Sequence, residues 1–222
     1  MNNKILIALE GADCAGKSSV INKLKSILPI MYPDKKFLFT REPGNLLSQD
    51  NESEKIRQKL LHDDSLTNKE QAKLFAKSRL YHTKDIIDKI NEGYIVITDR
   101  FLLSSYIYQG ENTSSKKLLD MNRETCKLLN DNNIHLETIV FKITEDTYNN
   151  RMNNRKETKD VMEDVNIEQI YNRINKFNAI DNKTSLININ NNNVSTIDAN
   201  GNDYSRILID VLYQINITLN EN

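Results

Sequence analysis

The sequence predicts an α/β fold in which helices flank a doubly wound, five-stranded parallel sheet. Two observations lead to this class. Short, nearly unbroken apolar runs rich in β-branched and aromatic residues are typical of strands covered on both faces, and they lie at 5–9, 37–40, 94–98, 138–143 and 195–198. Longer stretches with helical apolar spacing separate them. Strands that alternate with helices imply right-handed crossovers and therefore parallel strands.

Each helix is placed by apolar residues three or four positions apart. The first spans 17–28, and the second begins near Thr67 and ends at Gly93, since glycine commonly closes a helix. The other two lie around 118–129 and at about 203–219. Residues 149–164 are polar, charged and free of glycine, which fits either a solvated helix and loop or a short mobile lid.

Length and composition limit the class of protein. A chain of 222 residues predicts a single domain, 1–222. The net charge of −1 gives no overall field for nucleic acid, and no apolar run approaches the ~20 residues of a membrane helix, so we expect neither as a partner. The two cysteines fit a reducing, cytoplasmic setting, which would be the host cytoplasm if the asparagine bias reflects a viral genome. The asparagine-rich tract at 188–193 is interpreted as a polar loop.

The segment EGADCAGKSS at 10–19 follows the first strand and fits the phosphate-binding pattern G-x-x-x-x-G-K-[ST]. Its glycines let backbone N–H groups point at phosphate oxygens. Lys17 would reach the β and γ phosphates, and the Ser18 hydroxyl would bind Mg²⁺. The sequence therefore predicts an ATP or other nucleoside triphosphate site, lined on this loop by Gly11, Ala12, Cys14, Ala15, Gly16, Lys17, Ser18 and Ser19.

Two further stretches suggest a second ligand. In FTREPG (39–44), Arg41 lies at the carboxyl end of the second strand, where ligands bind in open α/β sheets. Phe75 and Arg79 are four residues apart on one helix face, so the ring can stack on a planar base while the arginine donates to a carbonyl. Taken singly, these stretches also fit a surface arginine and a core phenylalanine.

Charged side chains in two other stretches suit phosphate chemistry. In TDRFLLSSYIYQG (98–110), Asp99 would hold the Mg²⁺ shell and Arg100 would bridge two phosphates beside the phosphate-binding loop. In the polar segment, Arg151 and Arg155 are four residues apart and could close over the transferring group.

Together, FTREPG, LFAKSR and DR-x-x-x-S-x-x-x-YQG, in this order after the phosphate-binding loop, resemble the thymidylate kinase family of nucleoside monophosphate kinases. The resemblance runs nearly the whole length of the chain, as far as TIDAN (196–200). It implies transfer of the γ-phosphoryl group of Mg·ATP to the 5′-phosphate of thymidylate, giving dTDP, with dUMP as a possible second acceptor. It also implies a homodimer whose partners are small-molecule nucleotides.

The resemblance implies roles for the matching residues around the acceptor. Arg41 and Arg100 would hold the acceptor phosphate, and Asp13 would contact that region or the sugar 3′-hydroxyl. Phe75 would stack on the pyrimidine, and Arg79 would donate to its O4 carbonyl. The remaining acceptor positions surround the base and the sugar, with the tyrosine crowding the 2′ position: Pro43, Ser104, Ser105, Tyr108 and Gln109.

On the ATP side, Asp198 and Ala199 match the loop that lies behind the adenine. Cys14 stands where some family members carry an arginine, so charge stabilisation of the transferring group should come from the lid. The catalytic set is therefore expected to combine the phosphate-binding loop, the third strand and the lid, as Lys17, Asp99, Arg100, Arg151 and Arg155.

Three alternatives stay open. A deoxynucleoside kinase would need a carboxylate base near the second strand, and Glu42 is the candidate. A P-loop regulatory ATPase would hydrolyse ATP without any acceptor nucleotide. A catalytically weak homologue is suggested by Val161, which stands where the family's lid often has a second arginine.

Overall fold

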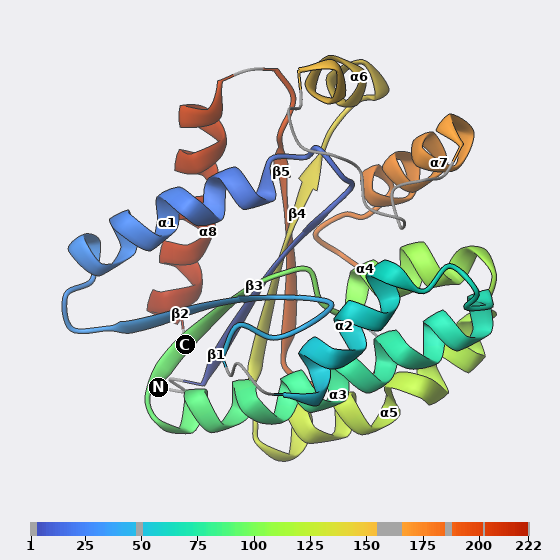
Figure 1. The fold of residues 1–222 in the computed structure, drawn as a ribbon. Helices are drawn as coiled ribbons and strands as arrows, with labels where there is room; N and C mark the ends of the chain where they lie inside the picture. Colours follow the sequence, from blue (N-terminus) through green and yellow to red (C-terminus); the bar gives the residue numbers. More distant parts are fainter. Residues whose placement is uncertain (1–3, 48–50, 155–165, 185–187, 202, 222) are drawn as a thin grey trace.

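The computed structural model describes residues 4–47, 51–154, 166–184, 188–201 and 203–221. Within them the strands form one parallel sheet in the order β2-β3-β1-β4-β5 (Figure 1). The strands are β1 (Ile5–Gly11), β2 (Lys36–Arg41), β3 (Tyr94–Asp99), β4 (His135–Lys142) and β5 (Asn192–Asp198). The predicted five-stranded, doubly wound class is confirmed.

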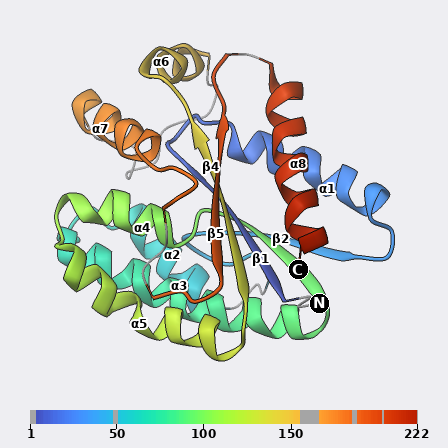
Figure 2. The ribbon, with the colours of Figure 1, turned by 180° about the vertical axis from the view of Figure 1, so that it is seen from behind.

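The helices form a layer on each face of this sheet. They are α1 (Lys17–Met31), α2 (Glu52–His62), α3 (Asn68–Asn91), α4 (Leu102–Tyr108), the 3₁₀ helix η1 (Gln109–Glu111), α5 (Ser115–Asp131), α6 (Glu145–Asn153), α7 (Ile167–Asn178) and α8 (Tyr204–Glu221). Figures 1 and 2 show α1 and α8 together on one side and α3, α4 and α5 on the other. Among the described residues, none of these helices has the length and apolar character needed to cross a lipid bilayer.

The central strand explains why the sheet forms where the apolar runs predict. All seven residues of β1 are buried, because helices cover both faces of the sheet. The parallel register places Leu9 and Arg41 each opposite Asp99. The carboxyl ends of β1, β2 and β3 therefore meet at one edge, where the phosphate-binding loop begins.

The ends of α3 follow the predicted signals. The Thr67 hydroxyl accepts from the Glu70 backbone N–H at 3.3 Å, and the Glu70 carboxylate accepts from the Thr67 N–H at 2.9 Å, which is a capping box. Gly93 follows the last turn with φ of +89°, a conformation that costs glycine little. Helices α2 and α7 were not predicted from the sequence. The apolar face of α2 is short, whereas α7 has a regular buried apolar face, so its sequence carried a helical signal that was missed. Helix α6 overlaps the stretch 149–164, for which a solvated helix was one of the two expectations.

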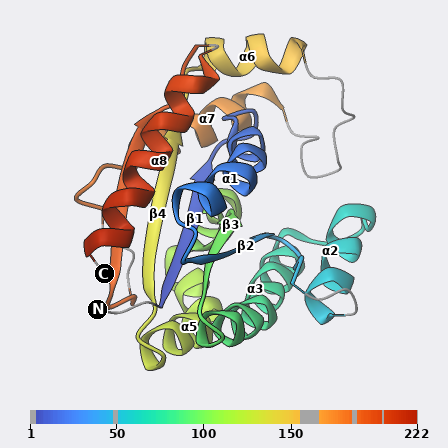
Figure 3. The ribbon, with the colours of Figure 1, turned by 90° about the vertical axis from the view of Figure 1, so that its left-hand side faces the viewer.

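The interpretation of 188–193 as a loop is wrong at its end, since Asn192 and Asn193 open β5. Their backbones pair with Leu136 and Glu137 of β4, and this pairing does not depend on apolar side chains. The same pairing lengthens β4 toward its start, where polar side chains hid the strand in the sequence. Residues 149–153 of the expected lid belong to α6 (Figure 3), and residues 155–164, including Arg155, lie outside the described residues.

Candidate functional site

A pocket of about 1060 Å³ opens where the carboxyl ends of β1, β2 and β3 meet. Most of the residues predicted from the sequence line it: Asp13, Cys14, Ala15, Gly16, Lys17, Ser18, Ser19, Arg41, Pro43, Phe75, Arg79, Asp99, Arg100, Ser104, Ser105, Tyr108, Gln109 and Arg151. Gly11, Ala12, Asp198 and Ala199 do not line it. The lining also includes residues that sequence reasoning missed or mentioned only as an alternative: Glu42, Arg57, Leu61, Asn150, Asn154 and Tyr204.

The phosphate-binding loop has the backbone geometry that its glycines predict. Gly16 caps α1 with φ of +95°, and Cys14 also has a positive φ of 60°. A Cβ at Gly11 would lie 2.9 Å from the Phe141 carbonyl oxygen, so this position has room only for glycine. The Lys17 ammonium donates to the Gly11 and Ala12 carbonyls at 3.0 and 2.9 Å. The loop thus keeps a buried cation beside its own concave backbone.

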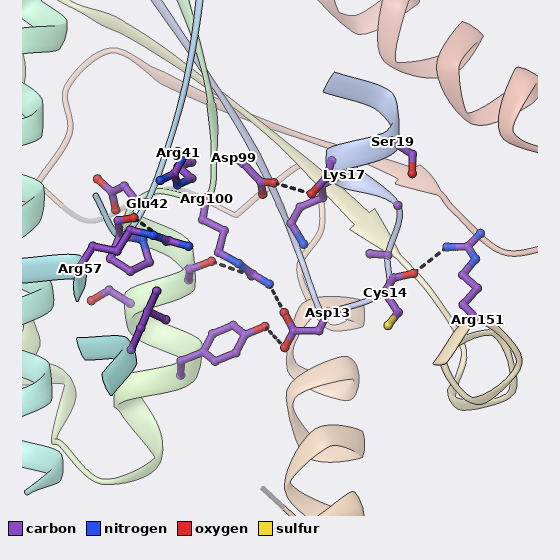
Figure 4. Close-up of a pocket in the computed structure, with 18 of the residues that line it drawn as sticks. Asp13, Cys14, Lys17, Ser19, Arg41, Glu42, Arg57, Asp99, Arg100 and Arg151 are labelled. Carbon is purple, nitrogen blue, oxygen red and sulfur yellow. Dashed lines mark hydrogen bonds and ion pairs between the residues drawn. The ribbon is translucent and has the colours of Figure 1, made fainter. Parts of the chain in front are cut away.

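Ser18 and Asp99 form a candidate Mg²⁺ site. The Ser18 hydroxyl donates to Asp99 Oδ2 at 3.0 Å (Figure 4). Adjacent corners of an octahedron with ligands at about 2.1 Å are about 3.0 Å apart, so the two oxygens have a suitable spacing for Mg²⁺. Asp99 Oδ1 is buried and accepts no hydrogen bond from the described residues. An oxygen pair with one unused carboxylate atom fits a hard cation that also binds phosphate.

Arg100 connects the end of β3 to the phosphate-binding loop. It donates to the Gly11 carbonyl at 2.8 Å and to the Ser104 hydroxyl at 3.2 Å, and it pairs with the Asp13 carboxylate. Burial alone would raise the pKa of Asp13, but Arg100 and Lys17 lower that pKa on balance. Asp13 is therefore held ionised beside the pocket. Arg100, which was expected to hold phosphate, is bound by protein acceptors in this structure.

Glu10, near the end of β1, supports this arrangement through hydrogen bonds to the start of α4. It was not singled out in the sequence as a site residue. It is fully buried, and its carboxylate accepts from the Phe101 N–H at 2.8 Å, the Ser104 N–H at 3.1 Å and the Ser104 hydroxyl. Burial raises the pKa of Glu10, although these donors oppose the shift. The contacts hold the first turn of α4 against the end of β1. An acidic residue directly before the phosphate-binding loop was the available signal.

Phe75 and Arg79 line one wall of the pocket from α3, as their spacing predicts. The Arg79 guanidinium is buried and donates to Glu42 Oε2 and Asn122 Oδ1, each at 2.8 Å, and to the Phe101 carbonyl at 3.4 Å. These contacts fix the plane of the guanidinium. The sequence showed the pair on one helix face, but it did not show the partners, which lie just after β2, just before α4 and within α5.

The end of β2 and the unpredicted α2 add two arginines. Arg41 donates to Glu54 at 3.3 Å, and its side chain is 33% exposed. Arg57 donates to the Pro43 carbonyl at 2.8 Å. Figure 4 shows both arginines beside Glu42, on the side of the pocket away from Cys14. Arg57 carried no signal in the sequence because α2 was not predicted.

Arg151 of α6 connects the phosphate-binding loop with the segment that follows β5. It donates to the Cys14 carbonyl at 3.0 Å (Figure 4). It also donates to the Ala199 and Gly201 carbonyls, each at 2.7 Å. Its guanidinium carbon lies 5.3 Å from the centre of the Tyr204 ring. Ala199 therefore contacts Arg151 through its backbone carbonyl. Asp198 is exposed, and its carboxylate oxygen Oδ2 lies 3.6 Å from a guanidinium nitrogen of Arg206.

The charge of the pocket favours a polyanion. Among the described lining residues, the cations are Lys17, Arg41, Arg57, Arg79, Arg100 and Arg151, and the acids are Asp13, Glu42 and Asp99. The pocket thus carries an excess of positive charge, although the whole chain has a net charge of −1. Such a local excess suits a ligand with several phosphates. The arrangement can bind two phosphate-bearing molecules, one on the phosphate-binding loop and one against β2 and α3.

Comparisons with known proteins agree with this geometry. The family described as thymidylate kinase has a model that matches residues 9–202. The chain is 49% identical to a thymidylate kinase of Mycoplasma mobile over 110 residues, which are 48% of this chain and 51% of that protein. It is 33% identical to a thymidylate kinase of Ureaplasma parvum over 179 residues, covering 78% of this chain and 74% of the relative.

These matches differ in extent. The chain spans about half the length of the first relatives that it matches. A crystal structure of thymidylate kinase from Ehrlichia chaffeensis has a TM-score of 0.60 at 21% identity, with 96% of this chain and 98% of that chain covered. At that identity the structural likeness shows a shared fold.

Proposed function

Because the chain belongs to the thymidylate kinase family, we propose that it transfers the γ-phosphoryl group of Mg·ATP to the 5′-phosphate of a pyrimidine deoxynucleotide, chiefly dTMP, giving dTDP. The observation that carries this proposal is that one pocket joins the phosphate-binding loop to the wall formed by Arg41, Phe75 and Arg79. A hydrolase would need only the first of these. A phosphotransferase between nucleotides needs both.

The ATP side of the proposal rests on the phosphate-binding loop and the Ser18–Asp99 pair. Lys17 would turn from the Gly11 and Ala12 carbonyls toward the β and γ phosphates. Ser18 and Asp99 would hold Mg²⁺, which supplies charge neutralisation to the phosphates when it is bound. The backbone N–H groups of the loop and the N-terminus of α1 would hold the phosphates in place.

The acceptor side rests on the opposite wall. Arg41 and Arg100 would hold the acceptor phosphate, with Asp13 near the sugar. Phe75 would stack on the base, and Arg79 would donate to O4, for which thymine and uracil are suited and cytosine is not. Because Arg79 already donates to three protein acceptors, it would approach the base in one fixed orientation.

The chemistry would then be a matter of placement and charge. Two polyanions must be held in line, and the cations of the pocket offset their repulsion. The acceptor phosphate is already anionic, so no strong base is required. Arg151 is bound to backbone carbonyls, so its proposed contact with the transferring group requires release from them. Arg155 keeps its proposed catalytic role from the sequence alone.

A specific observation bears on the deoxynucleoside kinase alternative. That enzyme would use Glu42 as a base, but Glu42 Oε2 accepts from Arg79 at 2.8 Å and Oε1 lies 3.4 Å from His82 Nδ1. Both oxygens are engaged with buried partners. This favours a positioning role for Glu42 over proton abstraction, so the phosphate-acceptor proposal is preferred.

We also propose that its partners are small-molecule nucleotides, that it forms a homodimer and that it acts in the cytoplasm. These points rest on family membership, on the low net charge and on the two cysteines, neither of which forms a disulfide among the described residues.

An ATP-consumption assay with dTMP, dUMP, dCMP, dGMP and thymidine as separate acceptors tests the proposal. We expect the highest kcat/KM with dTMP, a lower value with dUMP, and little turnover with dCMP or dGMP, because Arg79 matches a carbonyl at position 4. Turnover with thymidine alone would move the acceptor from a phosphate to a hydroxyl. ATP consumption that no acceptor stimulates would favour a regulatory ATPase.

ATP binding should depend on pH through Lys17. Burial, with Arg100 as the next cause, lowers the pKa of Lys17 to about 8 in the free protein. The ATP phosphates favour the charged ammonium and raise that pKa, so above pH 8 binding takes up a proton and weakens as pH rises. If only the charged form binds, affinity falls by about tenfold for each pH unit above the pKa.

Isothermal titration with Mg·ATP between pH 7 and pH 9.5, in buffers with different ionisation enthalpies, measures both effects. Lys17→Arg is the matched control, since arginine stays charged throughout this range. An ATP affinity that does not change with pH in the wild-type protein would contradict this prediction.

A further inference from the structure

The ring of Tyr108 is held by charged side chains from several elements. Its hydroxyl donates to Asp13 Oδ2 at 3.1 Å. The guanidinium carbons of Arg100 and Arg173 lie 5.0 and 4.7 Å from the ring centre. Guanidinium groups at these distances are attracted to an aromatic face. Tyr108 lines the pocket, whereas Arg173 does not.

Arg173 is held in place by Glu111, at the end of η1. Its Nε and a terminal nitrogen donate to the two Glu111 carboxylate oxygens at 3.0 and 2.9 Å. Both side chains are 10% exposed, so this is a buried bidentate pair, and the two donors fix the guanidinium plane. Neither residue was singled out in the sequence.

The same helix contacts Tyr108 a second time. Phe177, one turn after Arg173 on α7, meets the Tyr108 ring edge to face, with the ring centres 6.2 Å apart. The ring is therefore restrained by its hydroxyl bond, by two guanidinium groups and by a second aromatic ring. A ring with so many partners cannot move aside without losing several contacts together.

The position of Tyr108 makes that restraint relevant to the acceptor. In the proposed function, Arg100 and Asp13 lie at the phosphate end of the acceptor subsite and Phe75 and Arg79 at its base end, and all four line the pocket. Tyr108 bonds to Asp13 and lines the same pocket, so in the proposed function it would face the sugar that joins phosphate to base. Rejection of a substrate by a clash requires a wall that does not yield.

We propose that Arg173, oriented by Glu111, is a specificity-determining positioning residue that holds the Tyr108 ring against the sugar subsite, so that acceptors with a 2′-hydroxyl are rejected. This inference rests on the proposed function. Arg173 does not line the pocket, so it would act on the acceptor through its contact with the Tyr108 ring and through its charge near Asp13, whose pKa it helps to lower.

The test compares two acceptors that differ only at the 2′ position, dTMP and 5-methyluridine 5′-monophosphate. The wild-type protein should prefer dTMP. In Arg173→Met, which keeps the length of the side chain but removes the charge and the fork, the ratio of the two kcat/KM values should fall by about tenfold, at the low end of the discrimination a pocket achieves against one small group. Glu111→Gln, which keeps the shape, should shift the ratio in the same direction by less. Arg173→Lys should recover part of it.

Arg123→Met is the matched control, because Arg123 is 74% exposed on α5 and pairs with Asp120 on the surface. It should leave the ratio unchanged. A purely structural role of Arg173 would lower thermal stability, or kcat for both acceptors, without changing their ratio.

The outcomes separate the two proposals. A wild-type protein that phosphorylates neither acceptor overturns the proposed function and this inference with it. A wild-type protein active on dTMP, with ratios within twofold of wild type in both Arg173→Met and Glu111→Gln, overturns this inference alone. If Arg173→Met does not fold, the isosteric Glu111→Gln variant decides the question.

Discussion

Replacing Arg100 with alanine is expected to lower kcat for dTMP phosphorylation by about 10²–10³, the usual cost of removing one preorganised donor from a developing negative charge. Arg100 bonds to two groups of the phosphate-binding loop, the Gly11 carbonyl and the Asp13 carboxylate. Its removal takes away a proposed phosphate ligand and leaves the charge of Asp13 without its partner. The loss should appear mainly in kcat, measured by steady-state kinetics with saturating Mg·ATP.

Arg100→Lys separates charge from geometry. A lysine restores one positive charge but cannot bond to a carbonyl and a carboxylate as a planar fork does, so it should recover only part of kcat. Arg123→Ala on the surface should have no effect. A loss smaller than about tenfold in Arg100→Ala, with the thermal transition unchanged, would show that this side chain does not stabilise the transferring phosphoryl group.

Replacing Arg79 with alanine is expected to lower the free energy of unfolding by about 3–5 kcal/mol, the usual cost of removing one partner from a buried ion pair. Glu42 would be left with its side chain 4% exposed and without its guanidinium partner, and the Asn122 side-chain oxygen would lose its donor. The proposed contact of Arg79 with O4 predicts a loss of base selectivity in Arg79→Ala. The structure adds a large loss of stability, measurable by urea denaturation.

The two effects can be separated in the same series. Arg79→Ala combined with Glu42→Gln removes the uncompensated charge, so it should recover part of the stability but none of the selectivity. The dTMP-to-dCMP ratio of kcat/KM should fall in both variants if Arg79 reads the base. A stability loss below about 1 kcal/mol in the single variant would contradict the buried-pair argument.

Much of the fold could be predicted because its signals are local. The apolar run of β1, the capping box at Thr67 and the glycine-containing phosphate-binding loop each depend on neighbouring residues. Helix α2 lacks such a local signal, since only Ser53, Ile56 and Leu60 are buried along its eleven residues. The start of β5 was not predicted for a different reason. Its asparagine backbone is ordered by pairing with β4, and this pairing needs no apolar side chains.

The candidate site divides in the same way. The phosphate-binding loop, Phe75 with Arg79, and Asp99 with Arg100 are each contiguous or one helical turn apart, and the structure brings them to one pocket. Glu111 and Arg173 could not be found, because they are 62 residues apart in the sequence and the fold brings them together. Arg57 was missed because α2 was not predicted.

The sequence by itself determined the sheet class, the phosphate-binding loop and most of the side chains that line the pocket, because backbone preference and apolar spacing act over a few residues. Only the tertiary structure decided how those side chains are held. Arg79 is bound by Glu42 and Asn122, which are 37 and 43 residues away, and Arg173 contacts the Tyr108 ring at the pocket. Buried charges must find partners wherever the fold places them, and that requirement cannot be read from local pattern.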